Sequence, residues 1–149
     1  MYKHNQLRMV KTLAQKCQMI DSPNNIPKVA LSDLDFLTTD QMIEVDRLMT
    51  DVLEIKLIQM MENAGRNLAR LCVQRFLLDS PSPKIVVLAG TGGNGGGAMV
   101  AARRLHQWGA EVQVFSTKAD ESFTGVPAHQ LGILRKLGIA VSHLSLIHI

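Results

Sequence analysis

Hydrophobic and polar positions follow two different periods along this chain of 149 residues, and together they predict alternating strands and helices. Residues 85–89 form a continuous apolar run rich in β-branched side chains, which is typical of a fully buried parallel strand. Apolar residues then recur at helical spacing, and a second strand follows over 112–115. Another helical pattern covers 126–137, and a third strand begins over 139–141. This alternation predicts a parallel sheet with right-handed crossovers, in which the strand 85–89 is central and the strand 112–115 lies beside it.

Two helices are predicted ahead of the first strand, and we expect both to cover the sheet. Thr38 or Thr39 is a good N-cap for the first helix, and Asp40 in its first turn complements the helix dipole. The second helix runs over about 54–76. Its apolar stripe, which we interpret as its core face, consists of Leu57, Met60, Met61, Ala64, Leu68, Leu71 and Cys72. Gly65 within it costs about 1 kcal/mol relative to alanine, which predicts that another backbone passes close by.

Composition and charge exclude several classes of function. The net charge is +3, but residues 1–30 carry five basic residues against one acidic residue, so the remaining chain is not basic. No nucleic-acid surface is therefore expected. No apolar run is long enough to span a membrane. The two cysteines have no metal spacing, and we expect both to stay reduced in the cytoplasm.

Residues 1–30 are the least informative part of the sequence. Apolar residues at helical spacing allow a short amphipathic helix, so we interpret 1–30 as a poorly ordered or helical extension. The segment is basic and poor in acidic residues, which makes a mitochondrial transit peptide the alternative to a cytoplasmic location.

The candidate chemistry lies in a glycine-rich segment that follows the first strand. Six of the eight residues over 90–97 are glycine, and they lead into a helix. Strand, glycine loop and helix together form a cradle for an anion, because backbone N–H groups can approach a phosphate and the helix N-terminus adds positive potential. The stretch from Gly90 to Gly95 satisfies G-x-G-x-x-G. The alternative interpretation is a tightly packed turn that binds nothing.

Other nucleotide and catalytic patterns are weaker or absent from the sequence. A dehydrogenase would carry a carboxylate at the end of the second strand, and none occurs before Asp120. No Lys-Ser/Thr pair follows the glycines, which excludes a Walker loop. The five histidines make no metal-binding pair, and no nucleophile elbow is present.

Three blocks of sequence, covering about 37–109, together resemble one family. They are LTTDQMIEVDRLM, MMENAGRNLARL and GTGGNGGGAMVAARRLHQWG. In this order they are similar to the NAD(P)H-hydrate epimerase family, the YjeF N-terminal domain. The resemblance implies an α/β fold, a three-layer Rossmann-like sandwich with a parallel sheet that is preceded by two N-terminal helices. It also implies that the protein is often a homodimer. It implies an isomerase that interconverts the R and S epimers of hydrated NADH and NADPH, which are substrates rather than cofactors, with a bound potassium ion.

The resemblance also assigns site residues. The family's nucleotide-binding loop falls on Gly93, Asn94, Gly95, Gly96 and Gly97. Asn94 matches the expected potassium ligand, and a neutral carbonyl oxygen suits that cation. The chain departs from the family where Gly93 replaces an asparagine and Gly97 replaces an aspartate, changes that affect catalysis more than binding. The alternative function is therefore a non-catalytic nucleotide-binding or scaffold module of the same fold.

The family's catalytic aspartate is expected beyond Ile149, so we interpret the sequence as a C-terminally truncated and inactive epimerase. Residues 31–143 are then a partial YjeF N-terminal domain. The last six residues, 144–149, resemble the translation of a sequencing adapter, and we expect them to be an artefactual tail.

Overall fold

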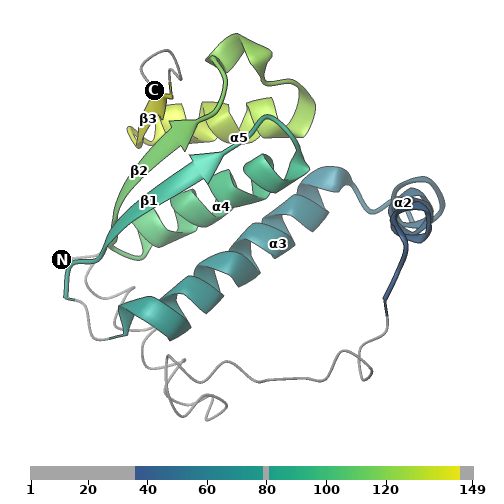
Figure 1. Ribbon diagram of the computed structural model, residues 1–149, viewed down its shortest axis with the longest axis horizontal. Coiled ribbons are helices and arrows are strands. Elements are labelled where there is room, and N and C mark those ends of the chain that lie inside the picture. The colour runs from purple at the N-terminus through teal and green to yellow at the C-terminus, as the bar shows by residue number, and fades with distance from the viewer. Residues whose placement is uncertain (1–35, 79–80, 145–149) are drawn as a thin grey trace.

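The computed structural model describes residues 36–78 and 81–144, and its centre is a parallel sheet of three strands (Figure 1). In order across the sheet these strands are β1 (Lys84–Ala89), β2 (Glu111–Ser116) and β3 (Ala140–His143). The predicted α/β class with a parallel sheet is confirmed. The predicted extension over 1–30 and the tail over 144–149, apart from Leu144, lie outside the described residues.

The expectation that the first strand is central and fully buried is wrong for the described part of the chain. β1 pairs with β2 in register from Lys84–Glu111 to Ala89–Ser116, and no described strand pairs with its other side. Val86 and Leu88 are 63% and 65% exposed. The apolar run over 85–89 has no polar alternation, so the sequence could not show that only one face is covered.

Three helices form a layer on the other face of the sheet, two of them packed on its strands and the third packed on a neighbouring helix. They are α3 (Leu57–Cys72), which continues into the π-helical turn η3 (Val73–Leu77), α4 (Gly93–Gln107) and α5 (Gly125–Lys136). Ala89, Val112 and Val114 are buried on the covered face. Among the residues that the structure describes, this gives one helical layer on one sheet, and the third layer of the predicted sandwich is not seen.

The core lies between α4 and its neighbours. α4 packs against α3, α5, β1 and β2, and most of its residues from Gly95 to Leu105 are buried. The largest fully buried apolar side chains are Met99, Leu134, Val73, Val100 and Val114. The predicted helix over 126–137 is confirmed as α5, which ends before Gly138 at φ 69°, and the short helix η4 (Asp120–Ser122) precedes it.

The predicted first helix is α2 (Thr39–Arg47), followed by the π-helical turn η2 (Leu48–Val52). The N-cap at Thr38 is confirmed: its Oγ1 accepts from the Gln41 N–H at 3.2 Å, and its own N–H donates to Gln41 Oε1 at 2.8 Å. The expectation that this helix covers the sheet is wrong. α2 lies to the side of the body in Figure 1 and contains no buried residue.

The core face predicted for α3 is also wrong in part. Met61, Gly65 and Ala69 are its buried residues, whereas Leu57 and Leu68 are 49% exposed. The small residues explain this orientation, because they let α3 approach α4 more closely than a leucine face would. A Cβ at Gly65 would lie 2.5 Å from both Gly97 O and Val100 Cβ. The predicted close backbone is therefore confirmed, and it belongs to α4.

Candidate functional site

The glycine segment connects the carboxyl end of β1 to the start of α4. The chain leaves β1 at Ala89, crosses Gly90 to Gly92 and enters α4 at Gly93. Most of the predicted glycine loop is therefore the first turns of a helix. Glycine is a poor helix former, so propensity alone favours a loop for these residues. Tertiary contacts decide the conformation instead.

Two of the glycines are required by close packing. A Cβ at Gly95 would overlap the backbone of Gly90, including its carbonyl oxygen. A Cβ at Gly96 would overlap the Met61 side chain, which comes from α3. Any larger residue at these two positions would push the start of α4 away from β1 or α3, so these glycines fix the position of the helix N-terminus.

The other two glycines of the predicted site have no such constraint. A Cβ at Gly93 or Gly97 would meet no atom within 4 Å. The two positions are one helical turn apart on α4, so they share a face. Side chains could be accommodated at both, and steric packing does not explain why this chain has glycine there.

That face of α4 borders a small pocket. The pocket is about 280 Å³ and lies between the start of α4 and the helix α3. Its lining includes Met61, Ala64 and Leu68 of α3, and Gly93, Asn94 and Gly97 of α4. No described carboxylate lines it. The pocket is thus an apolar hollow beside a segment of exposed backbone.

The electrostatics of the segment favour an anion. The N-cap residue is Gly92, which has no side chain to accept from the first-turn N–H groups, and the first turn contains no acidic residue. The Gly96 N–H donates to Gly92 O at 3.0 Å, but the N–H groups that precede it in a helix have no intrahelical acceptor. They lie at the positive end of the helix dipole. In parallel α/β sheets, ligands bind at this carboxyl edge of the strands.

The described residues do not by themselves form a potassium site. Asn94 is exposed and lies at the positive end of α4, and among the described residues that line the pocket it alone has a side-chain oxygen. Within the described ranges, no group of three His, Cys, Asp or Glu side chains could hold a metal ion. The potassium ion therefore stays a prediction, as does the catalytic aspartate expected beyond Ile149.

A charged cluster that the sequence patterns do not single out joins the three helices. Glu62 of α3 accepts from Arg103 Nη2, from Arg104 Nη2 at 2.8 Å and from Gln130 Nε2 of α5 at 3.2 Å. Burial raises the pKa of Glu62, but the hydrogen bonds from the two arginines outweigh it and hold this pKa below its usual range. The signal in the sequence is an acidic residue beside the core residue Met61 and an Arg-Arg pair on the next helix.

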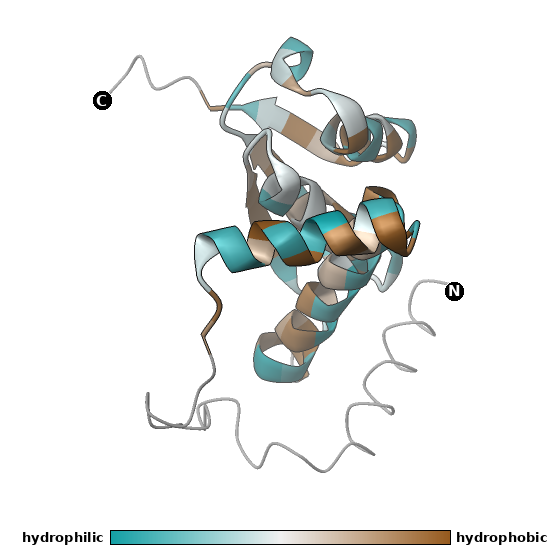
Figure 2. Cartoon of the chain, turned by 90° about the vertical axis from the view of Figure 1, so that its right-hand side faces the viewer, coloured by the Kyte–Doolittle hydropathy of each residue, from teal (hydrophilic) through white to brown (hydrophobic). Residues whose placement is uncertain are grey.

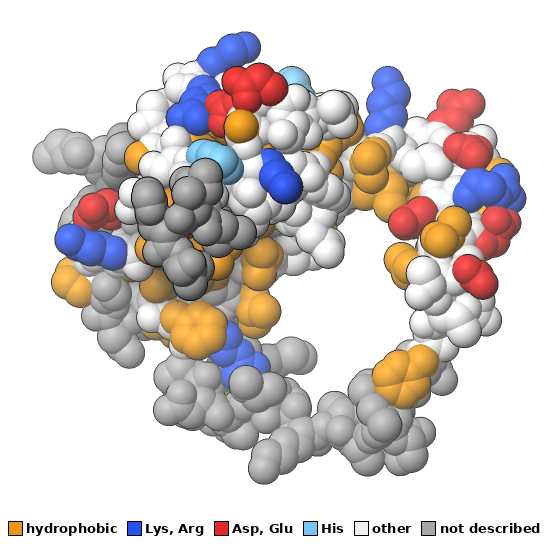
Figure 3. Space-filling view, turned by 45° about the horizontal axis from the view of Figure 1, so that its top comes forward, with side chains coloured by type: hydrophobic (Ala, Val, Ile, Leu, Met, Phe, Trp, Pro, Cys, Tyr) orange, Lys and Arg blue, Asp and Glu red, His pale blue; other side chains and the backbone are white. Residues whose placement is uncertain are grey.

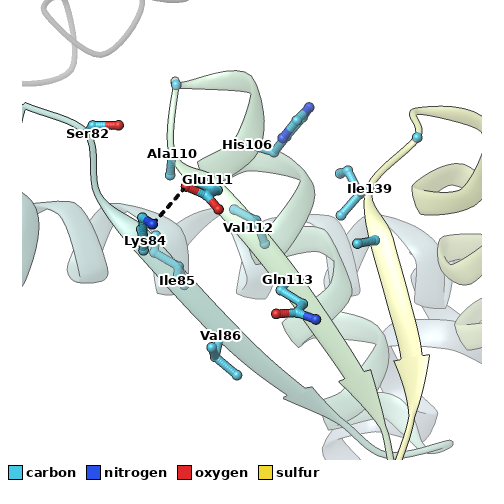
Figure 4. Close-up of a pocket in the computed structure, with 13 residues that line it drawn as sticks. Ser82, Lys84, Ile85, Val86, His106, Ala110, Glu111, Val112, Gln113 and Ile139 are labelled. Atoms are coloured by element: carbon cyan, nitrogen blue, oxygen red, sulfur yellow. Dashed lines mark ion pairs between the residues drawn. The ribbon is translucent and has the colours of Figure 1, made fainter.

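A larger hollow of about 710 Å³ lies at the opposite end of the sheet (Figure 4). It surrounds the amino ends of the strands, where Lys84 and Glu111 form an exposed ion pair at 3.6 Å. Within the part of the chain that the structure describes, no helix N-terminus and no glycine-rich segment borders it. Its size exceeds that of the pocket at α4, but the features that bind phosphate are at the other end.

Proteins with similar sequences are known over most of the described chain. A sequence model of the family described as YjeF-related protein N-terminus matches residues 57–148. The NAD(P)H-hydrate epimerase of Dehalogenimonas lykanthroporepellens is 39% identical over 102 residues, which are 68% of this chain and 41% of that protein. The bifunctional NAD(P)H-hydrate repair enzyme Nnr of Thermofilum pendens is 43% identical over 82 residues, which are 55% of this chain and 15% of that protein.

A solved structure is also similar. The crystal structure of the yeast protein ynu0, YNL200c, matches with a TM-score of 0.65 and 27% sequence identity, covering 74% of this chain and 47% of that one. The chain thus spans less than half the length of each of these three proteins. No described helix is long and apolar enough to cross a membrane.

Proposed function

The chain belongs to the family of the YjeF-related protein N-terminus, and we propose that it is the nucleotide-binding portion of an NAD(P)H-hydrate epimerase. The intact protein interconverts the R and S epimers of hydrated NADH and NADPH. The observation that carries the proposal is the uncapped start of α4 at the carboxyl edge of β1, which Gly95 and Gly96 hold in place. The relatives with this activity in their names support it.

The described residues account for binding rather than for the chemical step. Backbone N–H groups of the first turn of α4 hold the phosphates of the dinucleotide, and the helix dipole strengthens that contact. A fixed phosphate positions the rest of the substrate for reaction. Epimerisation removes and returns the hydroxyl at C6 of the hydrated nicotinamide ring, and a carboxylate moves the proton.

No described carboxylate lines the pocket at α4, so we propose that the proton-handling aspartate is supplied beyond Ile149. We also propose that Asn94 gives one oxygen to a potassium ion whose other ligands come from outside the described residues. We also propose a cytoplasmic location, where thiols such as the free Cys72 stay reduced.

A non-catalytic nucleotide-binding module is the second candidate. The observation that favours it is the open space at Gly93 and Gly97, where side chains would fit and this chain has none. Such a module would bind the same dinucleotide through the backbone of α4. It would not turn the dinucleotide over, either as the 149-residue chain or in an extended version of the protein.

Two assays on purified protein separate these candidates. The 149-residue chain should be stabilised against heat by ADP-ribose and should not epimerise hydrated NADH. A version extended by the missing part of a relative should epimerise hydrated NADH if the chain is an epimerase portion. Stabilisation by ADP-ribose without turnover in the extended protein would support the non-catalytic module, and a folded chain without stabilisation would contradict both candidates.

A further inference from the structure

The end of β2 lies beside the glycine segment. The Thr117 N–H donates to Ala89 O at 3.0 Å, which extends the pairing of β1 with β2 by one residue beyond Ser116. A Cβ at Gly90 would lie 3.8 Å from Thr117 Oγ1, so the threonine hydroxyl lies next to the first residue of the glycine segment. Thr117 is exposed. It therefore borders the same carboxyl edge of the sheet as the start of α4.

The turn that follows β2 presents a lysine to solvent. Ser116 is buried, and its Oγ donates to Lys118 O at 2.8 Å. The carbonyl oxygen of Ser116 accepts from the Leu144 N–H at 2.9 Å, so this strand end is held from the β3 side as well as from the β1 side. Lys118 is exposed, and no carboxylate in the described ranges forms an ion pair with it. Its ammonium group is therefore available to an anionic ligand at this edge.

The first acidic residue after β2 is Asp120, and an arginine neutralises it. Asp120 Oδ2 accepts from Arg135 Nε at 3.1 Å and from Arg135 Nη2 at 2.9 Å. Arg135 Nη1 also donates to Val141 O at 2.8 Å, which fixes the arginine in place. In dinucleotide-binding domains that use NAD, a carboxylate near the end of the second strand binds the ribose hydroxyls. The carboxylate that could do so here is engaged by Arg135 instead.

The segment between β2 and α5, residues 117–124, is polar at the surface. Figure 2 draws it at the top of the view mostly in teal and white, the colours of hydrophilic and intermediate residues. Figure 3, which brings the top of the molecule forward, shows basic side chains beside acidic ones on this face. Glu121 is the second carboxylate of the segment, and it is exposed and pairs with no described cation. The segment therefore suits a charged group, and Glu121 is the charge that opposes Lys118 there.

We propose that Lys118 and Thr117 bind the phosphate on the 2′ position of the adenosine ribose, so that this chain prefers hydrated NADPH to hydrated NADH. This preference rests on the proposed function, which puts the pyrophosphate at the start of α4. A dinucleotide held there extends its adenosine ribose toward the end of the second strand, where a basic residue accommodates a 2′-phosphate. The lysine ammonium and the threonine hydroxyl each donate a hydrogen bond to a phosphate oxygen, and opposite charge strengthens the bond from the lysine.

Isothermal titration of the 149-residue chain with ADP-ribose and with 2′-phospho-ADP-ribose tests the preference. The two ligands differ only in that phosphate, which carries roughly two negative charges at neutral pH. At low salt the phosphorylated ligand should bind at least about fivefold more tightly. Lys118→Gln should abolish the difference between the two Kd values, and Lys118→Glu should reverse it. Thr117→Val keeps the shape of the side chain without its hydroxyl, and it should reduce the difference by a smaller factor.

Two further variants control for the overall charge. The chain carries a net charge of +3, so a more negative ligand is attracted to it wherever that ligand binds. Lys84→Gln removes the same charge at the opposite end of the sheet, where Lys84 pairs with Glu111, and it should leave the preference intact. Glu121→Gln removes the opposing charge in the same segment as Lys118 and should strengthen the preference. Circular dichroism shows whether each variant is folded.

The outcomes separate this preference from the proposed function. Equal affinity of the wild-type chain for both ligands would overturn the preference and leave the proposed function standing. The same holds if Lys118→Gln keeps the wild-type preference, or if Lys84→Gln reduces it as much as Lys118→Gln does. A folded chain that binds neither ligand would overturn the proposed function and the preference with it.

Discussion

A carboxylate at position 97 should weaken nucleotide binding through its charge, without disturbing the fold. Gly97 lies one turn into α4 beside the pocket, and a Cβ there would meet no atom within 4 Å. Gly97→Asp can therefore be made without a steric clash. Position 97 lies about 6 Å along the helix from Gly93, the first residue of α4, at a rise of about 1.5 Å per residue, and we take this as the separation of the two charges.

The size of the effect follows from Coulomb's law. Two unit charges about 6 Å apart repel by about 0.7 kcal/mol in water and by about 3 kcal/mol at an effective dielectric constant of about 20. Each step of about 1.4 kcal/mol is a factor of ten in affinity. Gly97→Asp should therefore raise the Kd for ADP-ribose by between about threefold and about a hundredfold, with the larger value where the docked ligand excludes water.

Two matched variants isolate the charge. Gly97→Asn has nearly the same shape as Gly97→Asp and carries no charge, and Gly97→Ala reports the effect of helix propensity alone. Isothermal titration at low and high salt should show that the Gly97→Asp variant binds ADP-ribose more weakly than the Gly97→Asn variant. High salt should reduce this difference in affinity. Equal affinities of the Asp and Asn variants, or tighter binding by Asp, would refute phosphate binding near this turn.

Three further predictions concern the support of the site. Gly95→Ala should destabilise the fold by about 1–3 kcal/mol, because the new Cβ would overlap the Gly90 backbone. Gly93→Ala meets no such obstacle and should stabilise the fold by up to about 1 kcal/mol. Urea unfolding measures the free energy of unfolding of both variants. Gly96→Ala should destabilise the fold when made alone, because the Met61 side chain occupies the space that the new methyl group needs. Adding Met61→Ala should remove most of this clash. A double-mutant cycle in which the two losses of unfolding free energy simply add would contradict this contact. The arginines lower the pKa of Glu62 in the folded state. The ionised Glu62 side chain therefore stabilises the fold fully at a pH above the ordinary pKa that this residue has in the unfolded chain. This stabilisation is lost as the pH falls through the lower pKa of the folded state. Glu62→Gln should remove this part of the acid dependence, and an unchanged slope of unfolding free energy against pH would refute it.

The order and type of the elements can be predicted well from the sequence, because their periodicities are regular. The N-cap at Thr38, the helix α5 and the close backbone at Gly65 each have a local cause that the sequence displays. The helix α4 begins earlier than its glycines predict, because contacts of Gly95 and Gly96 with distant residues override glycine's low helix propensity.

Which face of a helix or strand is buried is harder to predict from the sequence than the presence of that helix or strand. The α3 face that packs on α4 is built from Gly65 and Ala69, which carry little hydrophobic signal, so the periodicity points to the leucines beside them as the core face. Likewise the apolar run of β1 has no alternation, and Val86 and Leu88 give no sign of the face that the described helices leave uncovered. Contacts with elements that are distant in the sequence determine which faces of α3 and β1 are buried.

Phosphate binding at the glycine segment is tested most directly by an NMR titration of the isotope-labelled chain with ADP-ribose, in which the backbone amide signals of its glycines are followed. We predict that the amide signals at the start of α4, those of Gly93 and Gly95 above all, shift on binding, whereas those of Gly109 and Gly138 at the larger hollow do not. Adenosine, which has no phosphate, should leave all of these signals in place. Shifts confined to Gly109 and Gly138, or no shifts in a folded chain, would contradict a phosphate-binding site at the glycine segment.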